Sequence, residues 1–246
     1  MKIISHKNMK YDYYSFLNQT INNPDIVGVS FDILMTSDEK IIIYTPNSNF
    51  STTISALQSN TYKNLKITDV LPLDETLNQF VGTNKKIVIN LLPIVSLQIT
   101  DYSLQNIIRI NEQYVRVVKN ILDKYPALEF YVCSTNENLV YHIKRILTNY
   151  KNGFVLTNLN TTYQDVDFYI FTTNMLDEKI IRQQLTLNRE IMIFILNAQD
   201  MDMILDWISS DNFSKNDKQI LNEIYFINNY PQLFLRIFNI KSNQFN

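Results

Sequence analysis

The chain has 246 residues, of which 46% are hydrophobic and 19% are charged, and its formal net charge is −2. This balance is ordinary for a globular protein and supplies enough apolar material for a sizeable core. It argues against a wholly disordered chain. A nearly neutral chain also lacks the basic footprint of nucleic-acid binders, so nucleic acid is not an expected partner.

The single cysteine and the few glycines exclude further classes of protein. Cys133 is the only cysteine, so no intramolecular disulfide can form and a reduced cytosol fits. Gly28, Gly82 and Gly153 are the only glycines, which excludes a Walker loop or a G-x-G-x-x-G fingerprint. Residues 1–6 do not begin a signal peptide, and no apolar stretch approaches the roughly 20 residues of a transmembrane helix. We therefore expect a cytoplasmic protein without a transmembrane segment.

Eight short runs rich in β-branched and aromatic residues recur along the chain, mostly separated by longer segments with helical spacing of apolar residues. Near-continuous apolar runs are typical of parallel strands covered on both faces, and their alternation with helices favours one parallel sheet. The expected strands are residues 2–6, 26–33, 86–92, 128–133, 152–157, 166–171, 191–196 and 223–228.

The connecting helices differ in clarity. The strongest amphipathic pattern covers residues 101–124 and stops before Pro126, and similar patterns cover 136–150 and 177–187. The link between the fifth and sixth strands, 158–165, is too short for a full helix, so one barrel helix is expected to be vestigial.

A further β-like run at 39–44 interrupts the alternation, and polar residues follow it to about residue 64. We interpret 39–64 as an insertion. No linker, charge block or separate repeat marks a domain boundary. Because α/β barrels commonly have about 250 residues, we expect a single (β/α)8 TIM barrel over 1–246 with a short β-containing insertion after its second strand.

In such a barrel the functional residues lie at the carboxyl ends of the strands, so the expected strands also predict a functional rim. Amides and hydroxyls dominate that rim, and Asp32 is the only carboxylate placed on it. The rim candidates are His6, Lys7, Ser30, Asp32, Asn90, Leu92, Cys133, Ser134, Thr157, Asn158, Thr172, Asn174, Asn197, Asn228 and Asn229.

Two N-terminal fragments resemble the glycerophosphodiester phosphodiesterase family. Residues 3–8, IISHKN, are similar to the family's opening IIAHRG. Residues 29–46, VSFDILMTSDEKIIIYTP, are similar to its I-E-x-D-V-x-x-T-x-D-G segment, which is followed by an apolar strand and H-D-P.

The resemblance continues in order along nearly the whole chain. Residues 73–77 match the L-x-E-x-L of the next helix, and INLL at 89–92 occupies the place of I-E-L-K. FILN at 194–197 is similar to W-T-V-N, and 224–231 resembles the closing G-I-I-T-D-x-P. The order and spacing of these fragments imply the TIM barrel of that family.

The resemblance also implies a site in which two histidines act as general acid and base and three carboxylates hold Ca²⁺ or Mg²⁺. The matching positions are His6, Asp32, Asn197 and, with lysine in place of arginine, Lys7. The departures are Ser30 and Asn90 for two glutamates, Tyr44 for the second histidine and Leu92 for lysine.

These departures weaken the implied chemistry. Hard cations need several oxygen ligands and negative charge, so Asp32 with Ser30 and Asn90 predicts at most a weak metal site. We expect no resident cofactor, with Ca²⁺ or Mg²⁺ needed only if activity remains. His6 would be a remnant general acid or base, whereas Tyr44 is a poor substitute because a phenol has a pKa near 10.

Simpler roles stay open for the same positions. His6 could be a buried histidine with its hydrogen bonds satisfied, Asp32 could be a capping residue, and Lys7 could be an ordinary surface lysine. Lys7 and Asn197 are also candidate substrate contacts. His142, the other histidine, falls on the buried face of a predicted helix and is expected to be structural. Cys133 lacks a histidine to activate it, so a nucleophilic role is disfavoured.

The leading hypothesis is a degenerate phosphodiesterase-like barrel that binds a small phosphodiester, a polyol phosphate or a protein partner without efficient turnover. The first alternative is an active metal-assisted hydrolase that converts a glycerophosphodiester to glycerol 3-phosphate and an alcohol, with ligands such as Asp74 or Glu75. The second is a scaffold or partner-binding protein, for example one that pairs with an active relative. The sequence leaves the oligomeric state open.

Overall fold

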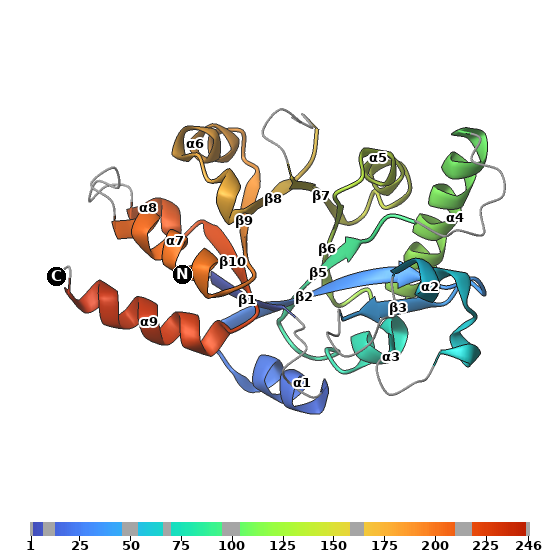
Figure 1. The fold of residues 1–246 in the computed structure, drawn as a ribbon, viewed down its shortest axis with the longest axis horizontal. Helices are drawn as coiled ribbons and strands as arrows, with labels where there is room; N and C mark the ends of the chain where they lie inside the picture. The colour runs from blue at the N-terminus through green and yellow to red at the C-terminus, as the bar shows by residue number, and fades with distance from the viewer. Residues whose placement is uncertain are drawn as a thin grey trace.

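The computed structural model describes residues 2–6, 13–45, 54–65, 70–94, 104–157, 165–209 and 218–244. Parallel strands form a closed ring, because the last of them pairs with the first (Figure 1). In ring order they are β1 (Lys2–His6), β2 (Ile26–Met35), β5 (Lys86–Leu91), β6 (Glu129–Ser134), β7 (Lys151–Leu156), β8 (Phe168–Thr172), β9 (Glu190–Ile195) and β10 (Ile224–Asn228). The expected (β/α)8 barrel is confirmed, with strand ends that differ by up to two residues.

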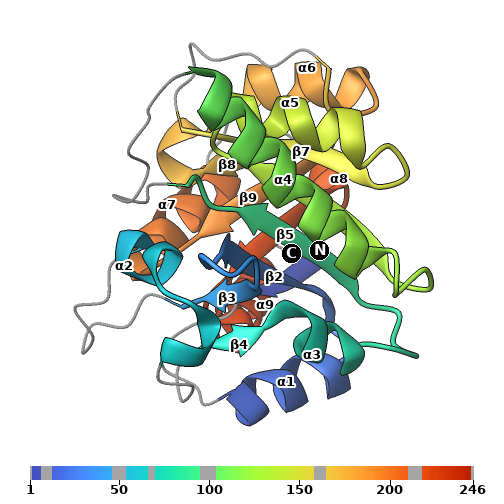
Figure 2. The same ribbon diagram turned by 90° about the vertical axis from the view of Figure 1, so that its right-hand side faces the viewer.

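Helices surround the ring on its outside (Figures 1 and 2). They are α1 (Tyr13–Asn22), α3 (Leu73–Asn78), α4 (Leu104–Leu122), α5 (Glu137–Ile146), α6 (Glu178–Thr186), α7 (Ala198–Ser209), α8 (Lys218–Leu221) and α9 (Pro231–Gln244). The Asn136 side chain accepts a hydrogen bond from the Leu139 amide and so starts α5, and Asp177 caps α6 in the same way. The predicted short link after β7 lies mostly outside the described residues. Within those residues, no helix is both long and apolar enough to cross a membrane.

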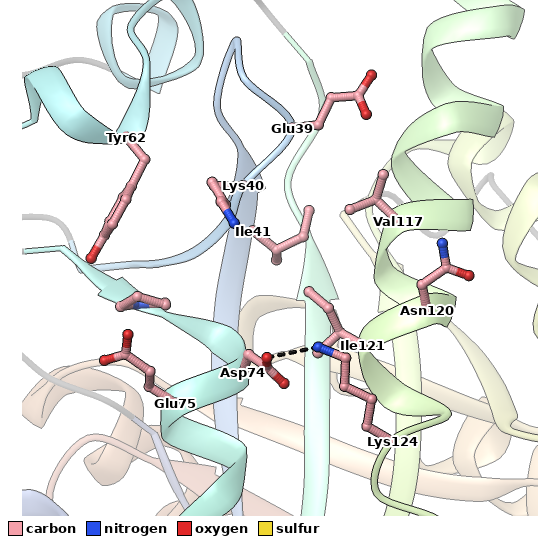
Figure 3. A pocket seen from close by; sticks show the side chains of 11 residues that line it. Glu39, Lys40, Ile41, Tyr62, Asp74, Glu75, Val117, Asn120, Ile121 and Lys124 are labelled. Carbon is pink, nitrogen blue, oxygen red and sulfur yellow. Dashed lines mark hydrogen bonds and ion pairs between the residues drawn. The ribbon is translucent and has the colours of Figure 1, made fainter.

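The insertion after β2 is also confirmed. It contains β3 (Ile41–Tyr44), α2 (Ile54–Ser59), the 3₁₀ helix η1 (Tyr62–Asn64) and β4 (Leu71–Pro72). β3 runs antiparallel to β2 and β4 antiparallel to β3, outside the ring. The insertion therefore extends beyond the predicted residue 64, because Leu71 and Pro72 pair with β3. Together with α3 and α4 it encloses a pocket on the flank of the barrel (Figure 3).

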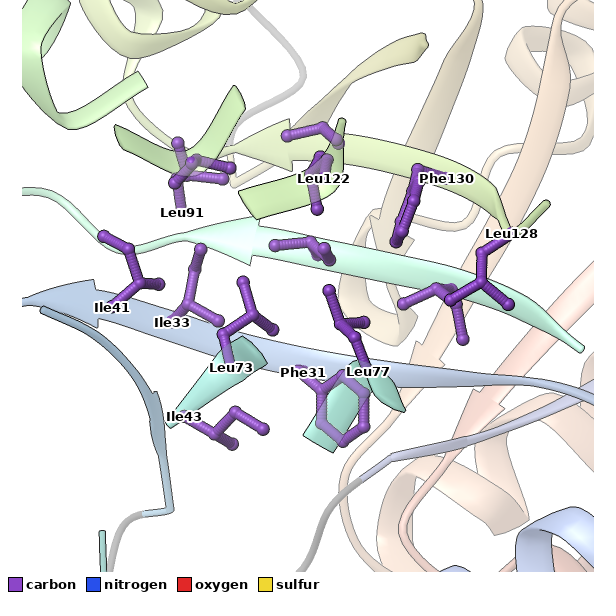
Figure 4. Close-up of a cluster of buried hydrophobic side chains, with 14 of the residues drawn as sticks. Phe31, Ile33, Ile41, Ile43, Leu73, Leu77, Leu91, Leu122, Leu128 and Phe130 are labelled. Carbon is purple, nitrogen blue, oxygen red and sulfur yellow. The ribbon is translucent and has the colours of Figure 1, made fainter. Parts of the chain in front are cut away.

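The main outer core lies between the barrel and the helices α3 and α4 (Figure 4). Phe31 and Ile33 of β2 pack against Leu73 and Leu77 of α3, and all four are fully buried. In the same cluster α4 buries Tyr114, Val115, Val118 and Leu122, whereas Leu104 and Ile108, expected on the same stripe, are exposed. The Tyr114 hydroxyl donates a hydrogen bond to the Ile33 carbonyl at 2.8 Å. This packing holds β2 and β5 in place at the barrel wall.

Charged groups close the amino-terminal end of the barrel. The Tyr131 hydroxyl bonds to Glu129 Oε1 at 2.9 Å and to Glu190 Oε2 at 3.0 Å, and Lys86 pairs with Glu129 at 2.6 Å. Lys151 completes the network through Glu190 and Tyr131. Burial and the neighbouring carboxylates raise the pKa of Tyr131, so its phenol stays a donor. Because the fold puts functional residues at the opposite end, this floor is structural.

Candidate functional site

His6 lies at the carboxyl end of β1, where the rim was predicted. Its side chain is 9% exposed, and its Nε2 lies 3.9 Å from Oδ2 of Asp32. The imidazole packs edge-on against the Phe194 ring of β9, with centroids 4.8 Å apart. The β1–β2 register places Ser30 beside His6, and inward positions alternate, so Asp32 lies on the same inner face. His6 is therefore held between an acid and an aromatic wall.

Asp32 and Asn90 form the other half of the cluster. The β2–β5 register pairs them, and Nδ2 of Asn90 donates a hydrogen bond to Asp32 Oδ1 at 2.8 Å. Oδ1 of Asn90 is buried and has no hydrogen-bond partner among the described residues. Burial, reinforced by the Asp32 charge, raises the pKa values of Tyr114 and Cys133. Tyr114 and Cys133 therefore keep their protons beside Asp32.

Ser30 and Tyr44 flank this cluster without adding charge. Ser30 is buried, and Tyr44 stands opposite Asp32 in the antiparallel β2–β3 pair. Tyr44 also packs against the small apolar cluster of the insertion around Leu34 and Ile42. The structure therefore brings His6, Asp32 and Asn90 into direct contact or near contact and leaves Tyr44 as part of the insertion's packing.

Several of the remaining predicted rim residues form local hydrogen bonds, and others lie outside the described residues. Asn197 is exposed, and its Oδ1 accepts a hydrogen bond from the Asp200 amide at 2.9 Å, so it caps α7. The Ser134 hydroxyl donates to the Leu91 carbonyl at 2.7 Å. Lys7 and Asn158 lie outside the described residues.

Two residues of the rim were not predicted from the sequence. Phe194 contacts His6, and the signal that could have indicated it is the alternation of inward positions on β9. Asp200 accepts hydrogen bonds from the Thr173 hydroxyl at 2.5 Å and from the Leu196 amide at 2.9 Å. It follows its strand by five residues, too far for a search confined to strand ends.

The donor set at the mouth does not fit the hard divalent cation that the family resemblance implies. Among the described residues, no group of three or more histidine, cysteine, aspartate or glutamate side chains is placed to hold a metal ion. Asp32 contributes a carboxylate and Asn90 a neutral amide oxygen, whereas Ca²⁺ takes about 6–8 oxygen ligands and Mg²⁺ six, with strong preference for carboxylates.

Comparison with solved structures shows which proteins are similar to this chain in fold. The chain is similar to a glycerophosphodiester phosphodiesterase from Parabacteroides distasonis, with a TM-score of 0.69, 13% identity and 98% of each chain covered. It is similar to a phosphodiesterase from Oleispira antarctica in complex with the product sn-glycerol-3-phosphate, with a TM-score of 0.72, 12% identity and 97% of each chain covered. A glycerophosphodiester phosphodiesterase from Agrobacterium tumefaciens has a TM-score of 0.63 and 13% identity over 95% of this chain and 98% of its own. The chain shares the fold of these enzymes.

No protein-family model and no curated protein sequence matches the chain. At 12–14% identity the solved structures therefore establish the barrel architecture, and the chemistry of the site has to be argued from its own residues.

The burial of Cys133 predicts an unreactive thiol. Its side chain is fully buried, its sulfur lies 3.6 Å from the Ile89 carbonyl, and burial followed by the Asp32 charge raises its pKa. We expect the native protein to react with a thiol reagent such as dithionitrobenzoate much more slowly than the same protein in denaturant. Equal rates in the two conditions would contradict this environment.

His142 predicts a pH dependence of stability. It is buried on α5, and burial together with Arg145 lowers its pKa, against a smaller opposing effect of Glu112. The unfolded chain therefore binds this proton first as the pH falls below about 6.5, and folding stability is lost in that range. Urea unfolding between neutral pH and mildly acidic pH should show a smaller loss for His142→Gln than for the unmodified protein, whereas parallel losses would contradict the prediction.

Proposed function

We propose that the barrel mouth binds a small phosphate ester of a polyol, either a phosphodiester or a phosphate monoester, in the cytoplasm and without efficient hydrolysis. The observation that carries the proposal is the His6–Asp32–Asn90 cluster at the carboxyl ends of β1, β2 and β5. The cluster contains an imidazole that can donate a hydrogen bond to a phosphate oxygen. At position 90 it has an amide where the family resemblance implies a metal-binding carboxylate. The glycerol-3-phosphate bound by the Oleispira antarctica protein, which has the same fold, supports this class of ligand.

The roles of the residues follow from their chemistry. His6 in its protonated form would donate to a phosphate oxygen, and Asp32 lies 3.9 Å from its Nε2. The free acceptor of Asn90 can receive a polyol hydroxyl, and Phe194 offers an apolar wall to the carbon chain. Lys7 and Asn197 remain candidate contacts of the ligand.

Slow turnover follows from what the cluster lacks. Among the described residues of the mouth, His6 supplies the one imidazole, so a second general acid or base would have to be the Tyr44 side chain. Loss of one such partner typically reduces the rate by about 10²–10⁴. Without the charge to hold a divalent cation, the mouth would also lose the Lewis-acid stabilisation of a transferring phosphoryl group.

The alternative of an active hydrolase with ligands from α3 has less support. Asp74 lies on the flank of the barrel, where it pairs with Lys124 at 2.8 Å and accepts a hydrogen bond from Tyr125 at 2.9 Å. The Asp74 carboxylate therefore already has a lysine and a tyrosine as partners. Glu75 follows it on the same short helix and lines the flank pocket.

A titration with sn-glycerol 3-phosphate, followed by nuclear magnetic resonance with and without Ca²⁺, tests the proposal. We expect shifts in signals at the barrel mouth that do not require Ca²⁺ and that weaken about tenfold or more in His6→Gln, as for loss of a charge-assisted hydrogen bond. His142→Gln is the matched control and should bind normally. Tight stoichiometric Ca²⁺ binding, or rapid Ca²⁺- or Mg²⁺-dependent hydrolysis of glycerophosphocholine, would overturn the proposal in favour of the hydrolase.

A further inference from the structure

A pocket of about 300 Å³ lies on the flank of the barrel between the insertion, α3 and α4 (Figure 3). Its walls come from the β2–β3 turn, η1, the first turn of α3 and the outer side of α4. His6, Asp32 and Asn90 do not line it, so it is separate from the barrel mouth. Cavities of about 300 Å³ and more are the size that holds small organic molecules.

Hydrogen bonds hold the walls of this pocket in place. Oδ1 of Asp38 accepts from the Tyr62 amide at 2.8 Å and from the Thr36 hydroxyl at 2.7 Å, which ties the β2–β3 turn to η1. The Asp74–Lys124 pair in Figure 3 ties α3 to α4. The pocket is thus formed before any ligand arrives, which lowers the entropy lost on binding.

The floor of the pocket is apolar. Ile41 is 3% exposed, and Val117, Ile121 and Pro72 are half-buried around it. An aliphatic group placed there would remove apolar surface from water on both partners.

Two charges on the rim of the pocket have no direct partner. Asp74 pairs with Lys124, whereas the side chains of Lys40 and Glu75 form no hydrogen bond or ion pair with the described residues. Burial raises the pKa of Asp74, but the contacts with Lys124 and Tyr125 and, as a minor contribution, the nearby charge of Lys40 lower it. Tyr62 stands beside Glu75, and burial followed by the Glu75 charge raises the pKa of its phenol. The pocket therefore combines an apolar floor with an aromatic ring and with the ammonium of Lys40 and the carboxylate of Glu75. The carboxylate of Glu39, which also lines the pocket, accepts a hydrogen bond from the Gln113 amide at 3.2 Å.

We propose that this pocket binds a small zwitterion with an aliphatic body, the chemical class of the aliphatic α-amino acids. The ligand's carboxylate pairs with Lys40, and its ammonium pairs with Glu75 beside the Tyr62 ring, where aromatic rings favour cations. The aliphatic side chain covers Ile41 and the exposed edge of α4. A ligand with a single charge leaves either Lys40 or Glu75 unpaired.

Three probes of nearly equal size test the requirement for both charges: L-leucine, 4-methylpentanoate without the ammonium and 3-methylbutylamine without the carboxylate. Titration of isotope-labelled protein should give a Kd for leucine of about 1 mM, as expected for so small a ligand. Both analogues should bind about fivefold more weakly, the effect of one exposed ion pair.

Two variants separate the contributions of the two charges. Lys40→Gln should weaken leucine and 4-methylpentanoate but not the amine, whereas Glu75→Gln should weaken leucine and the amine but not the acid. Lys63→Gln, on η1 but outside the pocket lining, is the matched control and should leave all three unchanged.

The proposal is overturned if leucine causes no shifts at about tenfold its expected Kd, if either analogue binds as well as leucine, or if neither Lys40→Gln nor Glu75→Gln changes binding. Shifts confined to the barrel mouth would also overturn it. Because His6→Gln leaves this pocket intact, failure here is distinguishable from failure of the proposed phosphate-ester site.

Discussion

Replacing Gly153 with alanine is expected to lower the free energy of unfolding by about 3 kcal/mol, at the upper end of ordinary overpacking. Gly153 lies in β7 and its inward side faces Phe168 of the next strand. An added Cβ would lie 2.4 Å from two carbons of the Phe168 ring. The ring is fully buried and packs against Tyr131, whose hydroxyl is held in the barrel floor, so it has little room to retreat. Urea unfolding measures the loss.

A double-mutant cycle shows whether that contact is the cause. Phe168→Leu removes the atoms that the new methyl group meets, so Gly153→Ala should be less harmful in that background by about 1 kcal/mol or more. Gly82→Ala is the control for backbone effects alone. Its φ of 82° is left-handed but nothing lies within 4 Å of an added Cβ, so about 1 kcal/mol is expected there. Additive losses in the cycle would contradict the steric explanation.

Replacing Asn90 with aspartate should destabilise the protein by about 2–3 kcal/mol at neutral pH, because it removes a hydrogen bond to a charged group and leaves a like charge in its place. The substitution changes the size of the side chain very little, but Asp32 loses the amide that donates to it at 2.8 Å. Protonation of either carboxyl removes the repulsion. The stability difference measured by urea unfolding should therefore shrink as the pH falls toward about 4.

The same variant tests whether position 90 controls cation binding at the mouth. Millimolar Ca²⁺ should raise the unfolding midpoint of Asn90→Asp, because two adjacent carboxylates attract a hard cation, and should do little to the unmodified protein. Asn90→Ala removes the hydrogen bond without adding charge and should not respond to Ca²⁺. A similar response of all three proteins would show that position 90 does not control cation binding.

Much of the barrel could be predicted because its signals are local and repeated. Apolar β-branched runs alternating with amphipathic segments indicated the eight barrel strands and the helices α4, α5 and α6. The insertion was recognised from its extra β-like run, but its end was placed too early. β4 is only two residues long and exists because it pairs with β3, which leaves almost no periodic signal in the sequence.

The candidate site was only partly predictable. His6 and Asp32 could be placed on the rim because they lie at or near the ends of expected strands, but their separation of 3.9 Å depends on the register between β1 and β2. Asn90 was identified as a position of lost charge, whereas its hydrogen bond to Asp32 required the β2–β5 register. Asn197, expected as a substrate contact, also caps α7, a role set by the backbone of the following turn.

The identity of the residues at the strand ends settled the kind of chemistry that the mouth can support, since charge and hydrogen-bonding capacity belong to the side chains themselves. Strand register and helix packing decided which of these groups meet, because they bring residues tens of positions apart within bonding distance. The flank pocket is the clearest case. Lys40, Glu75 and Val117 lie far apart in the chain, and the packing of the insertion, α3 and α4 gathers them around one cavity.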